Sequence, residues 1–330
     1  MKKKTIFSIV LWLAALVCCL MLLDSAMRRD DGERKYGEFF ESETGFDVLF
    51  MGTSRVLNGI SPMELWRDFG VTSYNMGNNS EVLDVTEQVM RLAFDIHKPK
   101  VAMIDVFYVN HAVDEDWTYP YRHMFFDEIP LSLAKFEAVR ATLPKSEWVE
   151  FMIPFSLYHS RWEELITGGA EPQVTCETYT MGMELRCASV PRDAAPRTDA
   201  LYEDDLPGMD ALRRIIEFCR ESGVEPVLMT MPGYAQEENQ MMMNAALALG
   251  EEMGAAVLDM HAMDGIVTHA TDSYDWIGHL NPSGASKATA YVGAWLTENY
   301  DLADHRGQAG FARWDENLAK YEAYRASVWE

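Results

Sequence analysis

The sequence lacks the short motifs that mark several large enzyme classes. Its 330 residues contain no G-x-x-x-x-G-K-[ST], no G-x-G-x-x-G and no H-E-x-x-H, so a nucleotide, nicotinamide or zinc-protease mechanism has no footing. No C-x-x-C pair occurs among the five cysteines, which leaves a structural zinc site or a thioredoxin-like site without support. No internal repeat or low-complexity tract is visible. We therefore expect no cofactor and no bound metal.

Positive charge is also scarce. The chain has 28 Lys and Arg residues against 52 Asp and Glu residues, a net charge of −24 at pH 7. This excess argues against nucleic acid as a partner, because the phosphates would be repelled, and it disfavours tight electrostatic binding of a strongly anionic wall polymer. A soluble acidic surface is the simpler explanation. The hydrophobic fraction of 48% is that of a globular protein, and the length suits one large α/β domain with an insertion, or two small domains.

The few cysteines fall into two groups. Cys18 and Cys19 lie in an N-terminal apolar run, while Cys219 falls on the apolar face of an expected helix and is interpreted as a core residue. Cys176 and Cys187 flank a short polar segment and are able to form a disulfide if the body lies outside the cell.

The N-terminus has the pattern of a membrane anchor. Residues 1–4 are a basic start, and residues 5–23 carry no charge over a length of about 28 Å as a helix, close to the thickness of a bilayer core. The lysines should remain in the cytoplasm, which places the body outside. Asp24 does not fit a signal-peptidase site before a cut at Ala26, so an uncleaved anchor is favoured. Residues 24–45 are interpreted as a juxtamembrane linker.

Strand and helix patterns then alternate. Short buried strands are expected at 46–51, 71–76 and 101–107, with helices between them, one beginning at Ser61-Pro62 and ending near Gly70 and another over 81–97. The order β-α-β-α-β with short links predicts parallel strands with right-handed crossovers. The alternation returns after residue 200, with strands at 225–231 and 255–260 and helices at 207–222, 235–253 and 282–298.

Two segments depart from this alternation. Residues 111–200 are rich in aromatic residues and include two helical stretches near 131–152, and we interpret them as a mostly helical insertion that shapes a substrate cleft. The tail, residues 299–330, has a polar helical pattern with an aromatic stripe at Phe311, Trp314, Tyr321 and Tyr324, which predicts packing on the body or on a partner.

A candidate nucleophile follows the first expected strand. The run 46–51 ends at Gly52-Thr53-Ser54, at the strand end where α/β sheets place their ligands. A serine hydroxyl needs a base within hydrogen-bond reach, and the base needs a carboxylate to hold its tautomer. His279, just before the helix start Asn281-Pro282, and either Asp275 or Asp272 can supply these two groups.

These two stretches resemble the SGNH (GDSL-like) hydrolase superfamily. The sequence GTSR at 52–55 stands where the family has its G-D-S serine block, and DWIGHLNPSGA at 275–285 stands where it has D-x-x-H. The similarity covers roughly residues 46–298. It extends to the membrane-anchored, extracytoplasmic branch that works with membrane-bound O-acyltransferases or in D-alanine transfer to cell-wall polymers, in which a segment like 151–162 recurs. The resemblance implies a flavodoxin-like three-layer α/β/α fold with a five-stranded parallel sheet.

The resemblance also implies site residues. Ser54 would be the nucleophile and His279 the base. The family acid lies three residues before the histidine, a position held here by Trp276, so Asp275 is preferred as the orienting carboxylate and Asp272 is the alternative. Gly77 and Asn78, in the loop after the second strand, are expected to give backbone N–H groups to the oxyanion at a helix N-terminus, where the helix dipole also favours an anion. The family's third block, G-x-N-D after the third strand, is missing.

Three further residues are candidate substrate contacts. Arg55 is suited to an acidic sugar or a polymer phosphate, or alternatively to a local salt bridge. Tyr158 and Arg161 belong to an aromatic and cationic cluster suited to stacking on a sugar ring, or alternatively to packing within the insertion.

Together these features predict a membrane-anchored, extracytoplasmic serine acyl-transfer enzyme, an O-acetyltransferase or an acyl esterase, acting on a cell-envelope polysaccharide. The alternative is an inactive SGNH-fold scaffold or carbohydrate-binding partner of a membrane-bound O-acyltransferase, which the missing third block and the displaced aspartate favour.

Overall fold

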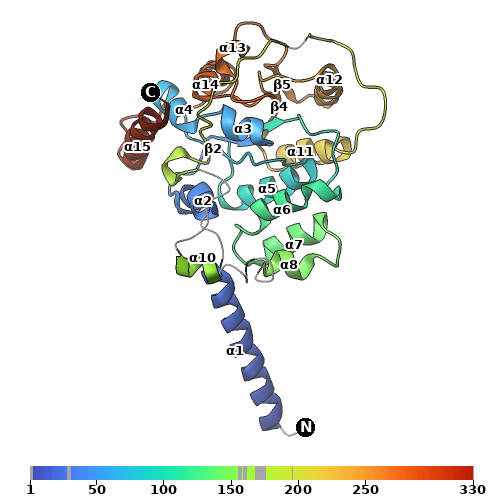
Figure 1. The fold of residues 1–330 in the computed structure, drawn as a ribbon, viewed down its shortest axis with the longest axis vertical. Coiled ribbons are helices and arrows are strands. Elements are labelled where there is room, and N and C mark those ends of the chain that lie inside the picture. Colours follow the sequence, from blue (N-terminus) through green and yellow to red (C-terminus); the bar gives the residue numbers. More distant parts are fainter. Residues whose placement is uncertain are drawn as a thin grey trace.

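The structure, a computed structural model, describes residues 3–27, 31–154, 158, 162–167, 176–194 and 196–329. A five-stranded parallel sheet lies at the centre of the body (Figure 1). Its strands are β1 (Val48–Met51), β2 (Ser73–Asn75), β3 (Val101–Asp105), β4 (Glu225–Thr230) and β5 (Ala256–Asp259). The predicted α/β class and the five parallel strands are confirmed, each strand falling inside its expected range.

Strand order decides where a site can form. The order in space is β2-β1-β3-β4-β5, so the chain changes direction across the sheet between β1 and β3. In register, Leu49 of β1 lies between Tyr74 of β2 and Ala102 of β3. Open parallel sheets bind ligands beyond the strand ends at such a change of direction. Ser54 follows β1 at this point.

Helices cover both faces of the sheet because alternate strand residues point to opposite sides. Leu49 and Met51 belong to one core cluster, with residues of α5 (Leu83–Ile96), α11 (Met209–Glu221) and α12 (Glu237–Glu252). Val48 and Phe50 belong to a second cluster, with residues of α3 (Ser54–Gly59), α4 (Pro62–Phe69) and α14 (Pro282–Asn299).

The helices next to the site begin at strong capping signals. The Ser61 hydroxyl accepts the N–H of Glu64, Pro62 holds the first position of α4, and Gly70 ends the helix at φ 70°, as predicted. The side-chain oxygen of Asn281 accepts the N–H groups of Ser283 and Gly284 at the start of α14. Both caps fix the directions of helices that leave the site.

The N-terminal helix α1 (Lys3–Met27) projects away from the body (Figure 1). Residues 4–23 are long and apolar enough to span a membrane, and none of this stretch is buried in the body. Part of the expected linker 24–45 is instead a packed helix, α2 (Asp31–Glu41), because Tyr36 and Phe39 give it an apolar face that the body buries. Phe39 stacks on Phe46 with 5.4 Å between ring centroids.

In the described part of the insertion, the chain forms α6 (Tyr119–Phe126), α7 (Leu133–Thr142), α8 (Trp148–Met152), α10 (Trp162–Thr167) and a short 3-10 helix at Thr178–Thr180. Its described part after residue 180 has neither helix nor strand. The disulfide considered between Cys176 and Cys187 is not formed: both are free thiols, the first buried and the second exposed. Cys219 is buried in the core, as predicted.

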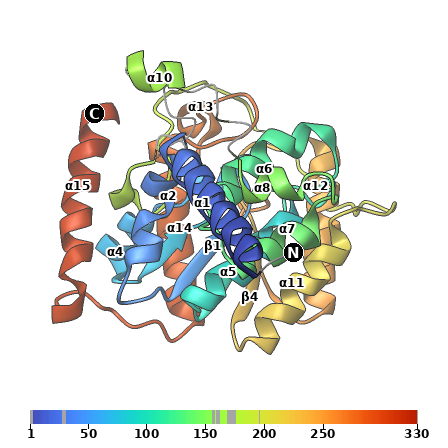
Figure 2. The ribbon, with the colours of Figure 1, turned by 90° about the horizontal axis from the view of Figure 1, so that it is seen from below.

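The C-terminal helix α15 (Ala312–Trp329) packs on the body, as its aromatic stripe predicted. It lies beside α4 and α14, on the opposite side of the body from α11 and α12 (Figure 2). Trp314 and Tyr321 are buried.

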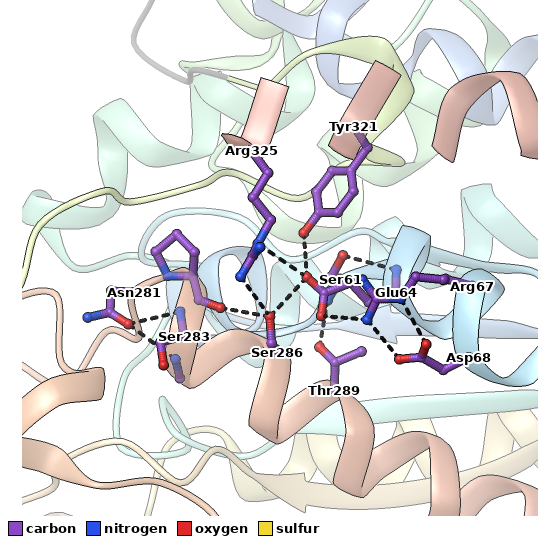
Figure 3. A network of polar contacts seen from close by, with 12 residues as sticks. Ser61, Glu64, Arg67, Asp68, Asn281, Ser283, Ser286, Thr289, Tyr321 and Arg325 are labelled. Atoms are coloured by element: carbon purple, nitrogen blue, oxygen red, sulfur yellow. Dashed lines mark hydrogen bonds and ion pairs between the residues drawn. The ribbon is translucent and has the colours of Figure 1, made fainter. Parts of the chain in front are cut away.

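A polar network joins these three helices (Figure 3). The buried carboxylate of Glu64 on α4 accepts hydrogen bonds from the Tyr321 hydroxyl at 2.8 Å and the Ser286 hydroxyl at 3.0 Å. Thr289 of α14 accepts the N–H of Ser61 at 2.9 Å. These hydrogen bonds link α4, α14 and α15.

Candidate active site

Ser54 is held at the carboxyl end of β1 by a tight turn. Gly52 adopts φ 131°, and a Cβ there would lie 2.6 Å from the Cβ of Asp105, so only glycine fits between β1 and β3. Thr53 caps α3, its hydroxyl accepting the N–H of Arg55. Ser54 is therefore the first residue of α3, and its half-buried side chain lies on the rim of the sheet.

His279 meets this serine from 225 positions further along the chain. The Ser54 hydroxyl lies 2.7 Å from His279 Nε2. On the other side of the ring, Nδ1 lies 2.6 Å from Asp275 Oδ2. The loop is closed by an isolated bridge between Ser273 and Leu280. A continuous hydrogen-bonded chain of serine, imidazole and carboxylate results.

The structure distinguishes the two candidate carboxylates. Asp275 Oδ1 accepts the backbone N–H groups of Ile277, Gly278 and His279 at 3.0, 3.1 and 3.2 Å, which leaves Oδ2 for the imidazole. Asp272 instead is fully buried and pairs with Lys287 Nζ at 2.6 Å. Asp272 therefore stabilises the start of α14, and the carboxylate four positions before the histidine is the one that orients it.

Asp275 keeps its charge in this environment. Burial acts to raise its pKa, but the hydrogen bonds from the His279 ring and from the loop N–H groups outweigh burial, so the pKa lies below its usual value. A charged acceptor fixes the Nδ1–H tautomer of His279, leaving Nε2 as the acceptor for the Ser54 proton.

The expected oxyanion donors are already engaged. The Gly77 N–H donates to the Asn75 side chain at 3.0 Å, and the Asn78 N–H donates to the Gly52 carbonyl at 2.9 Å. The first is a local side-chain bond in the turn after β2, and the second continues the pairing of β2 with β1 past the end of β2. The expectation for Gly77 and Asn78 therefore does not hold. Among the described residues, the N–H of Ser54 has no acceptor and remains available.

Arg55 has no ion pair within the described residues, contrary to one of its two expected roles. Its guanidinium donates to the carbonyls of Tyr234 at 2.6 Å and Ile277 at 2.8 Å, and it lies 3.6 Å from the centroid of the Phe107 ring. Burial lowers its pKa to about 10, although Asp105 acts to raise it. Arg55 thus links the loop after β4 to the loop that carries His279.

Asp105 is a site residue that the sequence reasoning missed. It ends β3 and is buried, and it accepts the Thr53 hydroxyl at 2.6 Å and the Phe107 N–H at 3.2 Å. Burial raises its pKa. A carboxylate directly after the apolar strand 101–104 was the available signal, since it lies at the same rim as Ser54.

A cavity of about 570 Å³ opens over Ser54 and His279. Arg55 lines it, together with residues from the insertion, from the loops after β2, β3, β4 and β5, and from α12. The other lining residues are Asn79, Ser80, Phe107, Tyr108, Tyr121, Arg186, Arg192, Tyr234, Ala235, Gln236, Asn239, Trp276 and Ile277.

Of the two insertion residues expected at the substrate, only Tyr158 is among the described residues. Tyr158 is not among the residues that line the cavity, and its hydroxyl donates to Asp127 at 2.7 Å, which is packing within the insertion. Arg161 lies outside the described residues.

The fold and the site together define a parallel α/β protein with a serine, a histidine and an aspartate in hydrogen-bonded sequence at the strand ends. Comparison with protein-family models finds no match, and comparison with curated proteins finds none either.

Proposed function

We propose that this protein is a serine acyl-transfer enzyme with an SGNH-type fold, acting on an acyl ester of a cell-envelope carbohydrate. The observation that carries the proposal is the 2.7 Å contact between the Ser54 hydroxyl and His279 Nε2, with Asp275 behind the ring. The strand order and the position of the serine after β1 support the family resemblance. We propose no cofactor.

The chemistry follows from the geometry. The Ser54 oxygen attacks the acyl carbonyl as its proton passes to His279 Nε2, and Asp275 stabilises the resulting imidazolium. Collapse of the tetrahedral adduct breaks the bond to the leaving alcohol, which takes the proton from His279. Water or a sugar hydroxyl then repeats the sequence and removes the acyl group from Ser54. The Ser54 N–H is a donor for the developing oxyanion.

A non-catalytic scaffold or carbohydrate-binding partner of a membrane-bound O-acyltransferase is the second candidate. The engaged N–H groups of Gly77 and Asn78 favour it, because each missing oxyanion donor costs a rate factor on the order of 100–1000. The short serine–histidine contact favours the enzyme.

Labelling with a fluorophosphonate probe separates the two candidates. The full chain in detergent should be labelled, and Ser54→Ala should abolish labelling. Ser80→Ala is the matched control, because Ser80 lines the same cavity and has no part in the hydrogen-bonded chain. Equal labelling of wild type and Ser54→Ala, or no labelling of folded wild type, would favour the scaffold.

We further propose that α1 anchors the protein in the cell membrane, with the N-terminus cytoplasmic and the body outside. The exposed apolar side chains of Leu133 on α7 and Val149 on α8, 73% and 77% exposed, support a membrane-facing end. Both helices lie at the end of the body from which α1 leaves (Figure 1). Protease added to intact cells should digest the body and spare the basic start; complete protection of the body would contradict this orientation.

A further inference from the structure

The cavity over Ser54 differs in charge from the rest of the chain. Three arginines, Arg55, Arg186 and Arg192, line it, and none of its lining residues is an aspartate or a glutamate. The chain as a whole has 52 acidic residues against 28 Lys and Arg residues. Cations therefore gather where the substrate would lie, in a protein in which acids predominate elsewhere.

The three arginines are not equally available to a ligand. Arg55 is committed to two backbone carbonyls, as described above. Arg186 pairs with Glu184 at 2.9 Å, which offsets part of its charge. Arg192 has no ion-pair partner among the described residues, and its Nε is a buried donor without an acceptor.

Aromatic rings hold Arg192 in place. The guanidinium carbon lies 3.2 Å from the centroid of the Tyr234 ring and 5.8 Å from that of Trp276. A guanidinium stacked on a ring keeps its N–H groups in a plane, and these groups match the two oxygens of a carboxylate or a phosphate. The rings orient the cation without neutralising it.

Local and overall charge act in opposite directions on an anionic ligand, and distance decides which prevails. Two opposite charges in contact attract each other far more strongly at the low effective dielectric constant of a protein cavity than in bulk water. Surface carboxylates further away than the screening length, about 8 Å at physiological salt, contribute little. The attraction of a bound anion to Arg192 therefore exceeds its repulsion by the remote surface carboxylates. The net charge alone would predict the opposite.

We propose that Arg192, supported by Arg186, forms an anion subsite beside Ser54 that binds a carboxylate or phosphate group on the carbohydrate substrate. That the bound anion belongs to a substrate rests on the proposed acyl-transfer function. The binding itself does not require Ser54 to react.

Calorimetric titration of the full chain in detergent tests the subsite. Methyl glucuronide and glucose 6-phosphate should bind at least tenfold more tightly than methyl glucoside, and added salt should weaken both acidic ligands. Tighter binding of the first assigns a carboxylate and of the second a phosphate. Arg192→Gln should reduce the affinity for the acidic sugar about tenfold or more, and Arg192→Lys should retain part of it.

The control variant is Arg213→Gln. Arg213 is exposed on α11 and does not line the cavity, so this variant makes the same change of net charge without touching the subsite. Melting temperatures identify any variant that is misfolded. Equal binding of acidic and neutral sugars by wild type, or equal losses in Arg192→Gln and Arg213→Gln, would overturn the proposal.

Ser54→Ala separates failure of the subsite from failure of the proposed function. The variant should bind the acidic sugar as tightly as wild type. Retained binding without any fluorophosphonate labelling of wild type would leave the subsite standing and remove the acyl-transfer function.

Discussion

Replacing Asp275 by asparagine should inactivate the site while leaving its shape intact. Asp275 Oδ1 accepts three backbone N–H groups of the loop. An amide nitrogen cannot accept these hydrogen bonds, so the asparagine must keep its oxygen on the loop and point its NH₂ group at His279. The ring Nδ1 must then accept a hydrogen bond, which moves the ring proton to Nε2.

The wrong tautomer disables the base. A protonated Nε2 donates to the Ser54 oxygen and cannot take its proton, and such an exchange costs a factor on the order of 10⁴ in turnover. The loop hydrogen bonds persist, so the free energy of unfolding should change by no more than about 1–2 kcal/mol. The rate of fluorophosphonate labelling and kcat/KM for p-nitrophenyl acetate measure the first effect, and the melting temperature measures the second.

Asp272→Asn is the matched comparison and should behave in the opposite way. This residue pairs with Lys287 and accepts the Thr268 N–H at 2.7 Å, so its neutral form should lower stability by about 1.5–3 kcal/mol. The labelling rate of the folded variant should stay within about threefold of wild type. A folded Asp275→Asn variant that keeps more than a tenth of the wild-type rate would refute the reasoning.

Three further predictions concern the surroundings of the site. Arg55→Lys removes the guanidinium that donates to the carbonyls of Tyr234 and Ile277. It should slow labelling about tenfold at an unchanged KM for p-nitrophenyl acetate. An unchanged rate would show that Arg55 does not position the histidine loop. Burial raises the pKa of Glu81 to about 8, so its stabilising neutral form is lost as pH rises from about 4.5 through 8. Glu81→Gln should therefore be more stable than wild type at pH 9, by about 3–5 kcal/mol in chemical unfolding, and equal curves at both pH 4 and pH 9 would contradict this. Tyr321→Phe removes the hydroxyl that donates to Glu64 and should lower stability by about 1.5–3 kcal/mol in the same assay, with activity at 25 °C retained; an unaltered unfolding midpoint would exclude the bond as a stabilising contact.

The sheet and the serine–histidine pair could be predicted because their signals are local. The short apolar run that ends at Gly52 fixes a strand end, and the capping pair Asn281-Pro282 fixes a helix start, each within a few residues. The preference for Asp275 over Asp272 rested on spacing, and the bond to His279 Nδ1 agrees with it.

The remaining site features depend on tertiary contacts, which local sequence patterns do not predict. The Gly77 N–H is occupied by the side chain of Asn75, and the Asn78 N–H is occupied by the Gly52 carbonyl at the end of β1. Arg192 comes from an irregular segment, and its contact with Tyr234 joins parts of the chain that are 42 positions apart. The helix α2 was interpreted as a linker because charged residues surround Tyr36 and Phe39, whose burial depends on the rest of the body.

The contacts of Tyr321 and Arg325 on α15 with the Glu64 carboxylate have a consequence for the order in which the protein is assembled during synthesis. The loop with Ser54 leaves the ribosome early and the loop with His279 leaves it late. Tyr321 and Arg325 leave it after both loops. A nascent chain that has not yet reached residue 312 lacks α15, so the Glu64 carboxylate does not yet receive the hydrogen bond from Tyr321. The packing of α15 on α4 is therefore added only after both loops have been synthesised, and a truncated product that ends before residue 312 lacks it.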